Sequence, residues 1–135
     1  ILILSRECVD LLNPKVVRST MGAIFRVPFV YVDSLEEVID TMKAQGIGIY
    51  GTCMEGSSPY DKVDYCKPSG MVIGNEANGI SNCVMDRLTG KISIPMDGKL
   101  ESLNAAVAAA LVMYEAARQR RNRSSQYCKN VRKGL

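Results

Sequence analysis

Short apolar runs alternate with helical segments along most of this chain, an order that few folds accommodate. The strand-like runs lie at residues 1–4, 27–32, 47–52, 71–74 and 91–95. Strands separated by helices form a mainly parallel sheet flanked by helices, so the sequence predicts an α/β domain. In such sheets ligands bind beyond the carboxyl ends of the strands, which here are followed by the segments after Thr52, Gly74 and Pro95.

Capping signals mark the ends of several helices. Asn13 precedes Pro14 at a helix start, where the missing N–H of proline would be unpaired in any case. Ser34 begins the next helix, Glu37 completes a capping box with it, and Gly46 ends that helix. The other expected segments are a polar loop with one short helix at 55–69, a helix from about Ser81, and a long helix from about Glu101 to Arg120.

The long helix expected at 101–120 carries apolar side chains on more than one face. One face holds Leu103, Val107, Ala110, Leu111 and Tyr114. Other small and apolar residues exceed what one core contact needs, and they are Ala105, Ala106, Ala109, Val112 and Met113. This surplus predicts a homodimer formed through the helix.

The composition limits the kinds of protein that this chain can be. Its 135 residues suffice for one domain, and no apolar run reaches the roughly 20 residues of a membrane helix, so we expect no membrane association. Five widely spaced cysteines without a CxxC pair, in a chain without histidine, predict reduced thiols of a cytoplasmic protein and no metal site. The absence of histidine also excludes an imidazole base within this chain.

The positive charge is concentrated near the C-terminus. The net charge is +3, yet residues 118–133 contain seven basic residues and no acidic one. We expect residues 121–135 to form a basic tail, which either contacts phosphates or is a solvated chain end. Charge alone does not decide between these two interpretations.

The segment MVIGNEANGIS, residues 71–81, places a glycine-bearing loop directly after a strand. Gly74 permits close approach of a flat or extended ligand, and Gly79 permits a turn with positive φ. Glu76 is a carboxylate in a loop of otherwise small residues, so we expect it to be paired, capping or functional. A plain strand-to-helix loop explains the rest of the segment equally well.

The segment ISIPMDGKLESLN, residues 92–104, joins the last strand to the long helix. Pro95 cannot donate to the sheet, so it ends the strand and leaves Ile94 and Met96 to line a pocket. Ser102 or Asn104 either caps the helix or directs a polar group into that pocket. Capping explains the presence of one of these two polar residues, and we expect the other to have a functional role.

These two segments together resemble the second and third motifs of the SpoU (TrmH) family in the SPOUT superfamily of methyltransferases. Members carry a strand, then G-x-E-x-x-G-x-S, and further on I-P-M-x-G-x-x-x-S-L-N-x-x-x-A. This chain has Gly74, Glu76, Gly79 and Ser81, followed by Ile94, Pro95, Met96, Gly98, Ser102, Leu103, Asn104 and Ala108. The segment 13–28 is similar to the stretch between the first two family motifs, so the resemblance extends to about Arg121.

The resemblance implies a fold, a cofactor and a reaction. The fold would be an α/β sheet with a C-terminal deep trefoil knot made by residues 50–56, 71–81 and 92–104, a rare exception to unknotted chains. The implied activity is S-adenosylmethionine-dependent methylation of an RNA ribose 2′-oxygen, with ribosomal RNA favoured as substrate, in a homodimer. The implied catalytic residues are Glu76, Ser102 and Asn104. The implied cofactor contacts are Thr52, Gly74, Asn75, Ile94, Met96, Leu103 and Asn104.

One family motif is absent. The first motif, N-x-G-x-x-x-R, would precede the strand at 1–4, and its arginine is credited with activating the ribose hydroxyl. Because the chain also begins within an apolar run, we expect residues 1–135 to be a methyltransferase domain lacking its N-terminal motif, able to bind cofactor but impaired in catalysis. The alternatives are a non-catalytic knotted RNA-binding or dimerisation module and a tRNA ribose methyltransferase. A Rossmann dinucleotide site would need G-x-G-x-x-G, which the sequence lacks.

Overall fold

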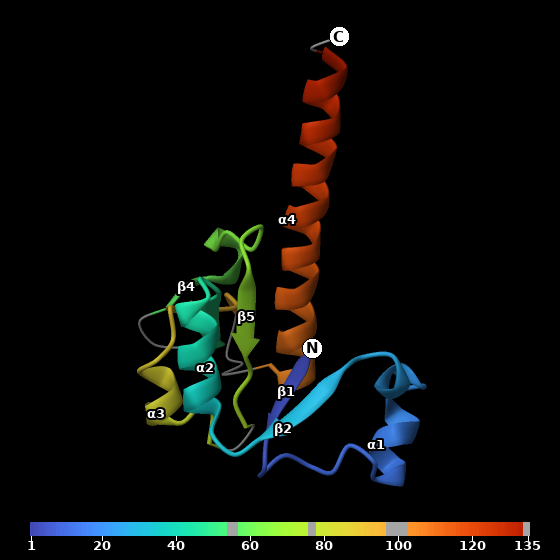
Figure 1. The fold of residues 1–135 in the computed structure, drawn as a ribbon, viewed down its shortest axis with the longest axis vertical. Coiled ribbons are helices and arrows are strands. Elements are labelled where there is room, and N and C mark those ends of the chain that lie inside the picture. The colour runs from blue at the N-terminus through green and yellow to red at the C-terminus, as the bar shows by residue number, and fades with distance from the viewer. Residues whose placement is uncertain (54–56, 76–77, 97–102, 134–135) are drawn as a thin grey trace. The chain divides into compact units, whose positions relative to one another are not determined.

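The computed structural model describes residues 1–53, 57–75, 78–96 and 103–133, with side chains to residue 124 (Figure 1). It divides into two compact units, residues 1–38 and 39–135, and the boundary falls within helix α2 (Leu35–Ala44). Each unit contains its own parallel strands. The α/β class with parallel sheets flanked by helices is therefore confirmed.

The first unit contains a two-stranded parallel sheet of β1 (Leu2–Ser5) and β2 (Phe29–Val32). Between them lie α1 (Pro14–Ser19) and the 3-10 helix η1 (Ala23–Phe25). The second strand is shorter than expected at its start. Pro28 accepts a hydrogen bond from the Leu2 N–H but has no N–H to donate, so the ladder begins after it.

The predicted capping signals are confirmed. Asn13 Oδ1 accepts a hydrogen bond from the Lys15 N–H at 2.9 Å, and Pro14 is the first residue of α1. Ser34 Oγ accepts from the Glu37 N–H at 3.2 Å at the start of α2. Gly46 has φ +78° just after α2, the left-handed conformation that commonly ends a helix.

The second unit is built on a four-stranded sheet with the order β4-β6-β3-β5. The central strands are β6 (Gly90–Ser93) and β3 (Gly48–Thr52), flanked by β4 (Ser58–Pro59) and β5 (Ser69–Val72). Every strand pairing in this sheet is parallel across the part of the chain that the structure describes. The helices of this unit are η2 (Tyr60–Lys62), α3 (Asn82–Met85) and α4 (Ala105–Lys133), besides most of α2.

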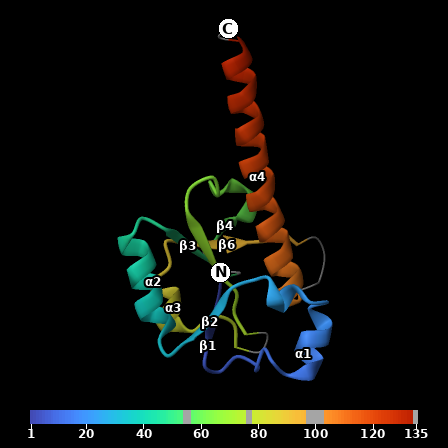
Figure 2. The ribbon, with the colours of Figure 1, turned by 45° about the vertical axis from the view of Figure 1, so that its right-hand side comes forward.

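The helices cover both faces of this sheet. Figure 2 shows α2 and α3 on one side and α4 on the other. The alternation of side chains along β3 explains the two layers: Ile49 lies toward α2, whereas Tyr50 packs against the cluster that includes Val112 of α4. A methyl group added at Gly51 would lie 2.5 Å from Leu88 Cδ1, so the chain after α3 approaches the sheet closely there.

The core between the sheet and α4 is centred on an aromatic residue. Tyr65 and Val112 are fully buried, Ile92 is 1% exposed and Ala116 is 6% exposed. The rings of Tyr65 and Tyr50 meet edge to face, with centroids 5.9 Å apart. Small side chains on α4 leave room for the Tyr65 ring against the helix.

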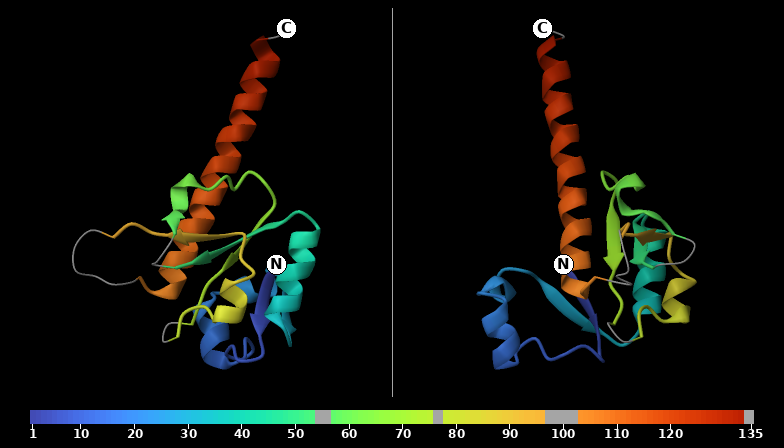
Figure 3. Two further views of the ribbon diagram at one scale, coloured as in Figure 1. Left: turned by 90° about the vertical axis from the view of Figure 1, so that its left-hand side faces the viewer. Right: turned by 180° about the vertical axis from the view of Figure 1, so that it is seen from behind.

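Two expectations about the C-terminal half need correction. The last helix does not begin near Glu101 and end at Arg120; α4 starts at Ala105 and continues past the strands to Lys133 (Figure 3). The loop expected at 55–69 also contains β4, whose Ser58 pairs with Ile92. Among the described residues, no helix has both the length and the apolar character that a bilayer crossing requires.

Candidate functional site

Three strand ends that the sequence singled out lie next to one another. Strand β3 is hydrogen-bonded to β5 on one side and to β6 on the other, and all three run in the same direction. Thr52, at the end of β3, is in register with Ile92, and the Cys53 N–H donates to the Ile92 carbonyl at 2.9 Å. The carboxyl ends of β5, β3 and β6 therefore share one edge of the sheet, where ligands bind in parallel sheets.

This edge gathers most of the predicted cofactor residues. The residues that follow the three neighbouring strand ends are Thr52, Gly74, Asn75, Ile94 and Met96. Thr52, Ile94 and Met96 are half-buried, so Ile94 and Met96 offer partly exposed apolar side chains near the edge. Their contact with a cofactor stays a prediction.

The loop after β5 is closed by its own backbone. The Asn75 N–H donates to the Gly79 carbonyl at 2.9 Å, and the Gly79 N–H donates to the Asn75 carbonyl at 2.7 Å. Gly79 has φ +66°, which confirms the predicted positive-φ turn. The Asn78 N–H also donates to Asn75 Oδ1 at 3.3 Å, and Glu76 lies outside the described residues.

The loop requires a glycine at position 74 for a structural reason that the sequence interpretation missed. A methyl group at this position would lie 2.4 Å from the Gly79 carbonyl carbon and 2.7 Å from the Ile80 nitrogen, both backbone atoms. Gly74 thus permits the loop to fold back on its own strand. The predicted approach of a ligand to Gly74 stays a separate prediction.

Asn104 caps α4. Its Oδ1 accepts hydrogen bonds from the Ala106 N–H at 2.9 Å and from the Val107 N–H at 3.4 Å. The capping interpretation is therefore confirmed for Asn104, and Leu103 beside it is half-buried. Ser102, the other candidate, lies outside the described residues.

A second polar cluster, on α4, was not singled out from the sequence. Glu115 is 8% exposed, and its carboxylate accepts from Arg118 Nε and Nη2 at 2.7 Å each. These hydrogen bonds from Arg118 hold the pKa of Glu115 below its usual value, against the opposing effect of burial. Gln119 Nε2 adds a third hydrogen bond to this carboxylate at 2.8 Å. The spacings of three and four residues along the helix were the available signal.

The same cluster fastens α4 to the segment before β5. Gln119 Nε2 donates to the Val63 carbonyl, and its Oε1 accepts from the Tyr65 N–H, both at 2.9 Å. Arg120 Nε donates to the Tyr65 carbonyl at 2.9 Å. The backbone of Tyr65 is thus hydrogen-bonded on both sides by consecutive residues of α4. Its buried hydroxyl has no partner among the described residues, and burial raises its pKa to about 12.

Metal ligation has no support in the described part of the chain. Across those residues, no three histidine, cysteine, aspartate or glutamate side chains are grouped so as to hold a metal ion.

Comparisons with known proteins agree on one family. The family model described as "SpoU rRNA Methylase family" matches residues 1–114. The 23S rRNA (uridine(2479)-2'-O)-methyltransferase of Streptomyces viridochromogenes is 40% identical, over 88% of this chain and 43% of its own length. The 23S rRNA (guanosine(2553)-2'-O)-methyltransferase RlmP of Bacillus subtilis is 33% identical, over 78% of this chain and 42% of its own length.

Solved structures agree with the sequence matches. The SpoU methyltransferase AviRb from Streptomyces viridochromogenes, in complex with the cofactor AdoMet, superposes with a TM-score of 0.81 at 38% identity. That match covers 89% of this chain and 49% of the AviRb chain, and this chain spans less than half the length of the two curated relatives. Since the family model covers most of the sequence and the relatives match in both sequence and fold, this chain belongs to the SpoU rRNA methylase family.

Proposed function

We propose that the protein containing this chain methylates a ribose 2′-oxygen of RNA, with ribosomal RNA as substrate and S-adenosylmethionine as methyl donor. The observation that carries the proposal is the shared sheet edge at which β5, β3 and β6 end. Family membership supports it, because the named relatives are 23S rRNA 2′-O-methyltransferases and AviRb was crystallised with AdoMet.

The residues at this edge fit such a cofactor. The reciprocal hydrogen bonds between Asn75 and Gly79 hold the backbone of this loop directly after β5. Ile94, Met96 and Leu103 are half-buried and apolar, which suits the flat face of an adenine ring. Backbone groups after Thr52 and Gly74 would supply the polar contacts.

Catalysis would rest on positioning. S-adenosylmethionine supplies an electrophilic methyl group on a sulfonium centre. The residues proposed to orient the ribose hydroxyl are Glu76, Ser102 and Asn104, and holding the hydroxyl in line with the methyl group converts an encounter into an intramolecular step. Asn104 Oδ1 also caps α4, so a part in orienting the hydroxyl would come in addition to that cap.

We also propose that the active protein is a homodimer. The face of α4 formed by Ala106, Val107, Ala110, Leu111 and Tyr114 lines an apolar recess of about 350 Å³. Tyr114 is 73% exposed and Val107 is 48% exposed, unusual values for large side chains that lie side by side on a helix. Val112, which the sequence grouped with the surplus residues, belongs instead to the core.

Two further properties belong to this proposal. The deep trefoil knot would be formed by residues 50–56, 71–81 and 92–104, and the position of β6 between β4 and β3 agrees with such a chain path. A cytoplasmic location would follow from the action on ribosomal RNA and from the free thiols of Cys8, Cys53, Cys66 and Cys83.

Cofactor binding and methyl transfer can be tested separately. Calorimetry should give one S-adenosylmethionine per chain, and the whole protein that contains this chain should transfer the methyl group of labelled cofactor to ribosomal RNA. Nuclease resistance and mass spectrometry would place the methyl group on a ribose oxygen. Methylation of a base would overturn the reaction, transfer only to tRNA would change the substrate, and RNA binding without any transfer would favour the non-catalytic module.

A further inference from the structure

Four arginines lie within six residues of α4, and the structure separates them into two kinds. Arg118 is held by the Glu115 carboxylate, and Arg120 donates to the Tyr65 carbonyl and, at 3.4 Å, to Ser69 Oγ. The guanidinium groups of these two residues are thus hydrogen-bonded within the domain. The other two are Arg121 and Arg123.

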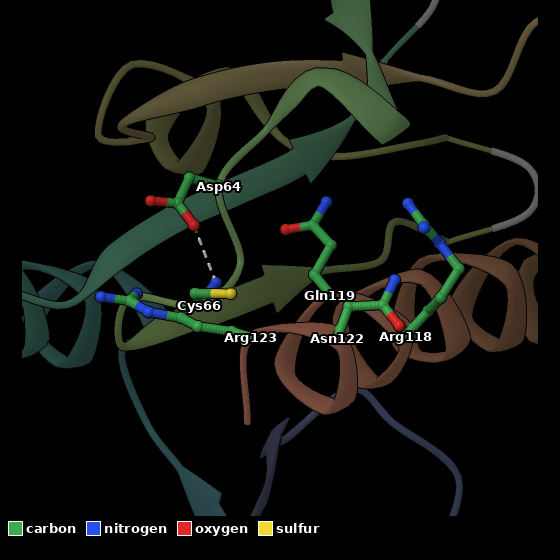
Figure 4. A pocket seen from close by; sticks show the side chains of 6 residues that line it. All are labelled: Asp64, Cys66, Arg118, Gln119, Asn122 and Arg123. Atoms are coloured by element: carbon green, nitrogen blue, oxygen red, sulfur yellow. Dashed lines mark hydrogen bonds between the residues drawn. The ribbon is translucent and has the colours of Figure 1, made fainter. Parts of the chain in front are cut away.

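Arg121 and Arg123 are exposed and make no hydrogen bond or ion pair with any other described residue. Arg123 lines an open recess of about 390 Å³ between α4 and the segment before β5. Figure 4 shows the amides of Gln119 and Asn122 between the two arginines of the recess, Arg118 and Arg123. The recess is therefore lined by one guanidinium paired with Glu115 (Arg118), one unpaired guanidinium (Arg123) and the side-chain amides of Gln119 and Asn122.

The surroundings of this recess favour an anion. The Glu115 carboxylate is neutralised by Arg118, and Asp64 is the one acidic residue among the described residues that line the recess. From Arg118 to Lys133 the sequence has seven basic residues and no acidic one, and all of them lie within α4. Charges of one sign along a helix sum to a potential that attracts a polyanion.

We propose that Arg121, Asn122 and Arg123 bind the sugar–phosphate backbone of the RNA substrate. Arginine and amide N–H groups are the usual donors to phosphate oxygens, and such contacts position an RNA without reading its sequence. The proposal rests on the proposed RNA methylation for the identity of the polyanion. It adds a binding surface separate from the strand ends that would hold the cofactor.

The chemistry of the lining favours RNA over other polyanions. Among the described residues that line the recess, none has a large apolar side chain that would take an acyl chain or anchor a peptide. The Asp64 carboxylate accepts a hydrogen bond from the Cys66 N–H through one oxygen, and its second oxygen is available to a hydroxyl donor. A ribose 2′-hydroxyl supplies that donor next to the phosphates, whereas DNA does not.

The test uses the chain with fluorescein-labelled single-stranded oligouridylate as the probe and measures the dissociation constant by anisotropy across a salt series. Arg121→Gln and Arg123→Gln should each weaken binding roughly fivefold at about 0.1 M salt and lower the salt slope by about 0.7; in combination, the loss should be about 25-fold. Asp64→Asn should lower the preference for oligouridylate over a DNA oligonucleotide of the same length, because it removes the carboxylate oxygen that would accept from the 2′-hydroxyl.

Arg6→Gln is the matched control. It removes the same charge from an exposed guanidinium paired with Asp33 at 2.8 Å in the first unit, and it should leave the salt slope unchanged. The Arg121 and Arg123 variants should also unfold at the wild-type temperature, since neither side chain makes a hydrogen bond or ion pair with another described residue. If the double variant is folded and keeps the wild-type affinity and the wild-type salt dependence of binding, the proposal of an RNA-binding surface is wrong.

The two proposals fail in different ways. A double variant that binds oligouridylate like the wild type, in a protein that still methylates ribosomal RNA, would refute the arginine surface alone. Weakened RNA binding in the double variant, in a protein that transfers no methyl group, would support the surface and refute the proposed reaction.

Discussion

Replacement of Gly74 by alanine tests whether the loop after β5 is the cofactor site. The new methyl group would lie 2.4 Å from the Gly79 carbonyl carbon, 2.7 Å from its oxygen and 2.7 Å from the Ile80 nitrogen. All three are backbone atoms, so no change of side-chain rotamer relieves the clash. The loop must open, and its two reciprocal hydrogen bonds between Asn75 and Gly79 must break.

The size of the effect follows from those two bonds. Each backbone hydrogen bond contributes about 1 kcal/mol, so opening the loop costs about 2 kcal/mol. If S-adenosylmethionine requires the closed loop, that energy is taken from binding, and the affinity falls about 30-fold. Gly79→Ala differs from Gly74→Ala in its physical cause, because a methyl group added at Gly79 meets no atom within 4 Å. Its cost is the backbone strain of a non-glycine residue at φ +66°, which is roughly 1–2 kcal/mol.

Calorimetry with S-adenosylmethionine and denaturant unfolding together decide the result. Gly22→Ala is the control, because it introduces a side chain at φ +85° in the first unit, whereas the loop belongs to the second unit. It should lower stability by a similar amount and leave cofactor affinity unchanged. Wild-type stability in Gly74→Ala would refute the steric argument. Lowered stability with wild-type affinity would refute the assignment of the loop to the cofactor site.

Four further outcomes are expected. The wild type should lose stability as the pH falls through the lowered pKa of Glu115, below the usual 4.5, because the depressed pKa adds stability only while the carboxylate is charged. In urea titrations at a series of pH values, Glu115→Gln should not show this contribution to the loss of stability in acid. Val112→Ala should lower the free energy of unfolding by about 2 kcal/mol. Leu111→Asp should give a folded monomer in sedimentation experiments if the exposed α4 face is the dimer interface. Asn104→Ala should cost about 1 kcal/mol of stability for the lost cap, and turnover lowered more than cofactor affinity would add a role in orientation.

Local signals in the sequence predicted local structure well. The caps at Asn13 and Ser34 and the turns at Gly46 and Gly79 depend on residues a few positions apart, and the structure has them where expected. The end of α4 was misplaced because no glycine or proline follows Arg120 until Gly134, so nothing in the sequence stops the helix there.

The face of α4 that packs on the sheet could not be chosen from spacing alone. Val107, Leu111 and Tyr114 form one apolar stripe, and Ala105, Ala109, Val112 and Ala116 form another on the opposite side with the same helical period. The structure buries the second stripe because small side chains admit the ring of Tyr65, a residue about fifty positions earlier in the chain. A contact of that separation leaves no periodic signal.

The attachment of α4 links the core to the candidate catalytic residues. Val112 and Ala116 pack α4 against the sheet, and Gln119 hydrogen-bonds the backbone of the segment that leads into β5. Together these contacts restrain both the rotation of α4 about its axis and its position along that axis. Asn104, the N-cap of α4, is separated by seven residues from Met96, which follows the last residue of β6 by three positions. Because a shift of α4 would break buried contacts, Leu103 and Asn104 at its start are held at a fixed position relative to the sheet. A site that works by positioning, in a chain without a histidine base, depends on that rigidity.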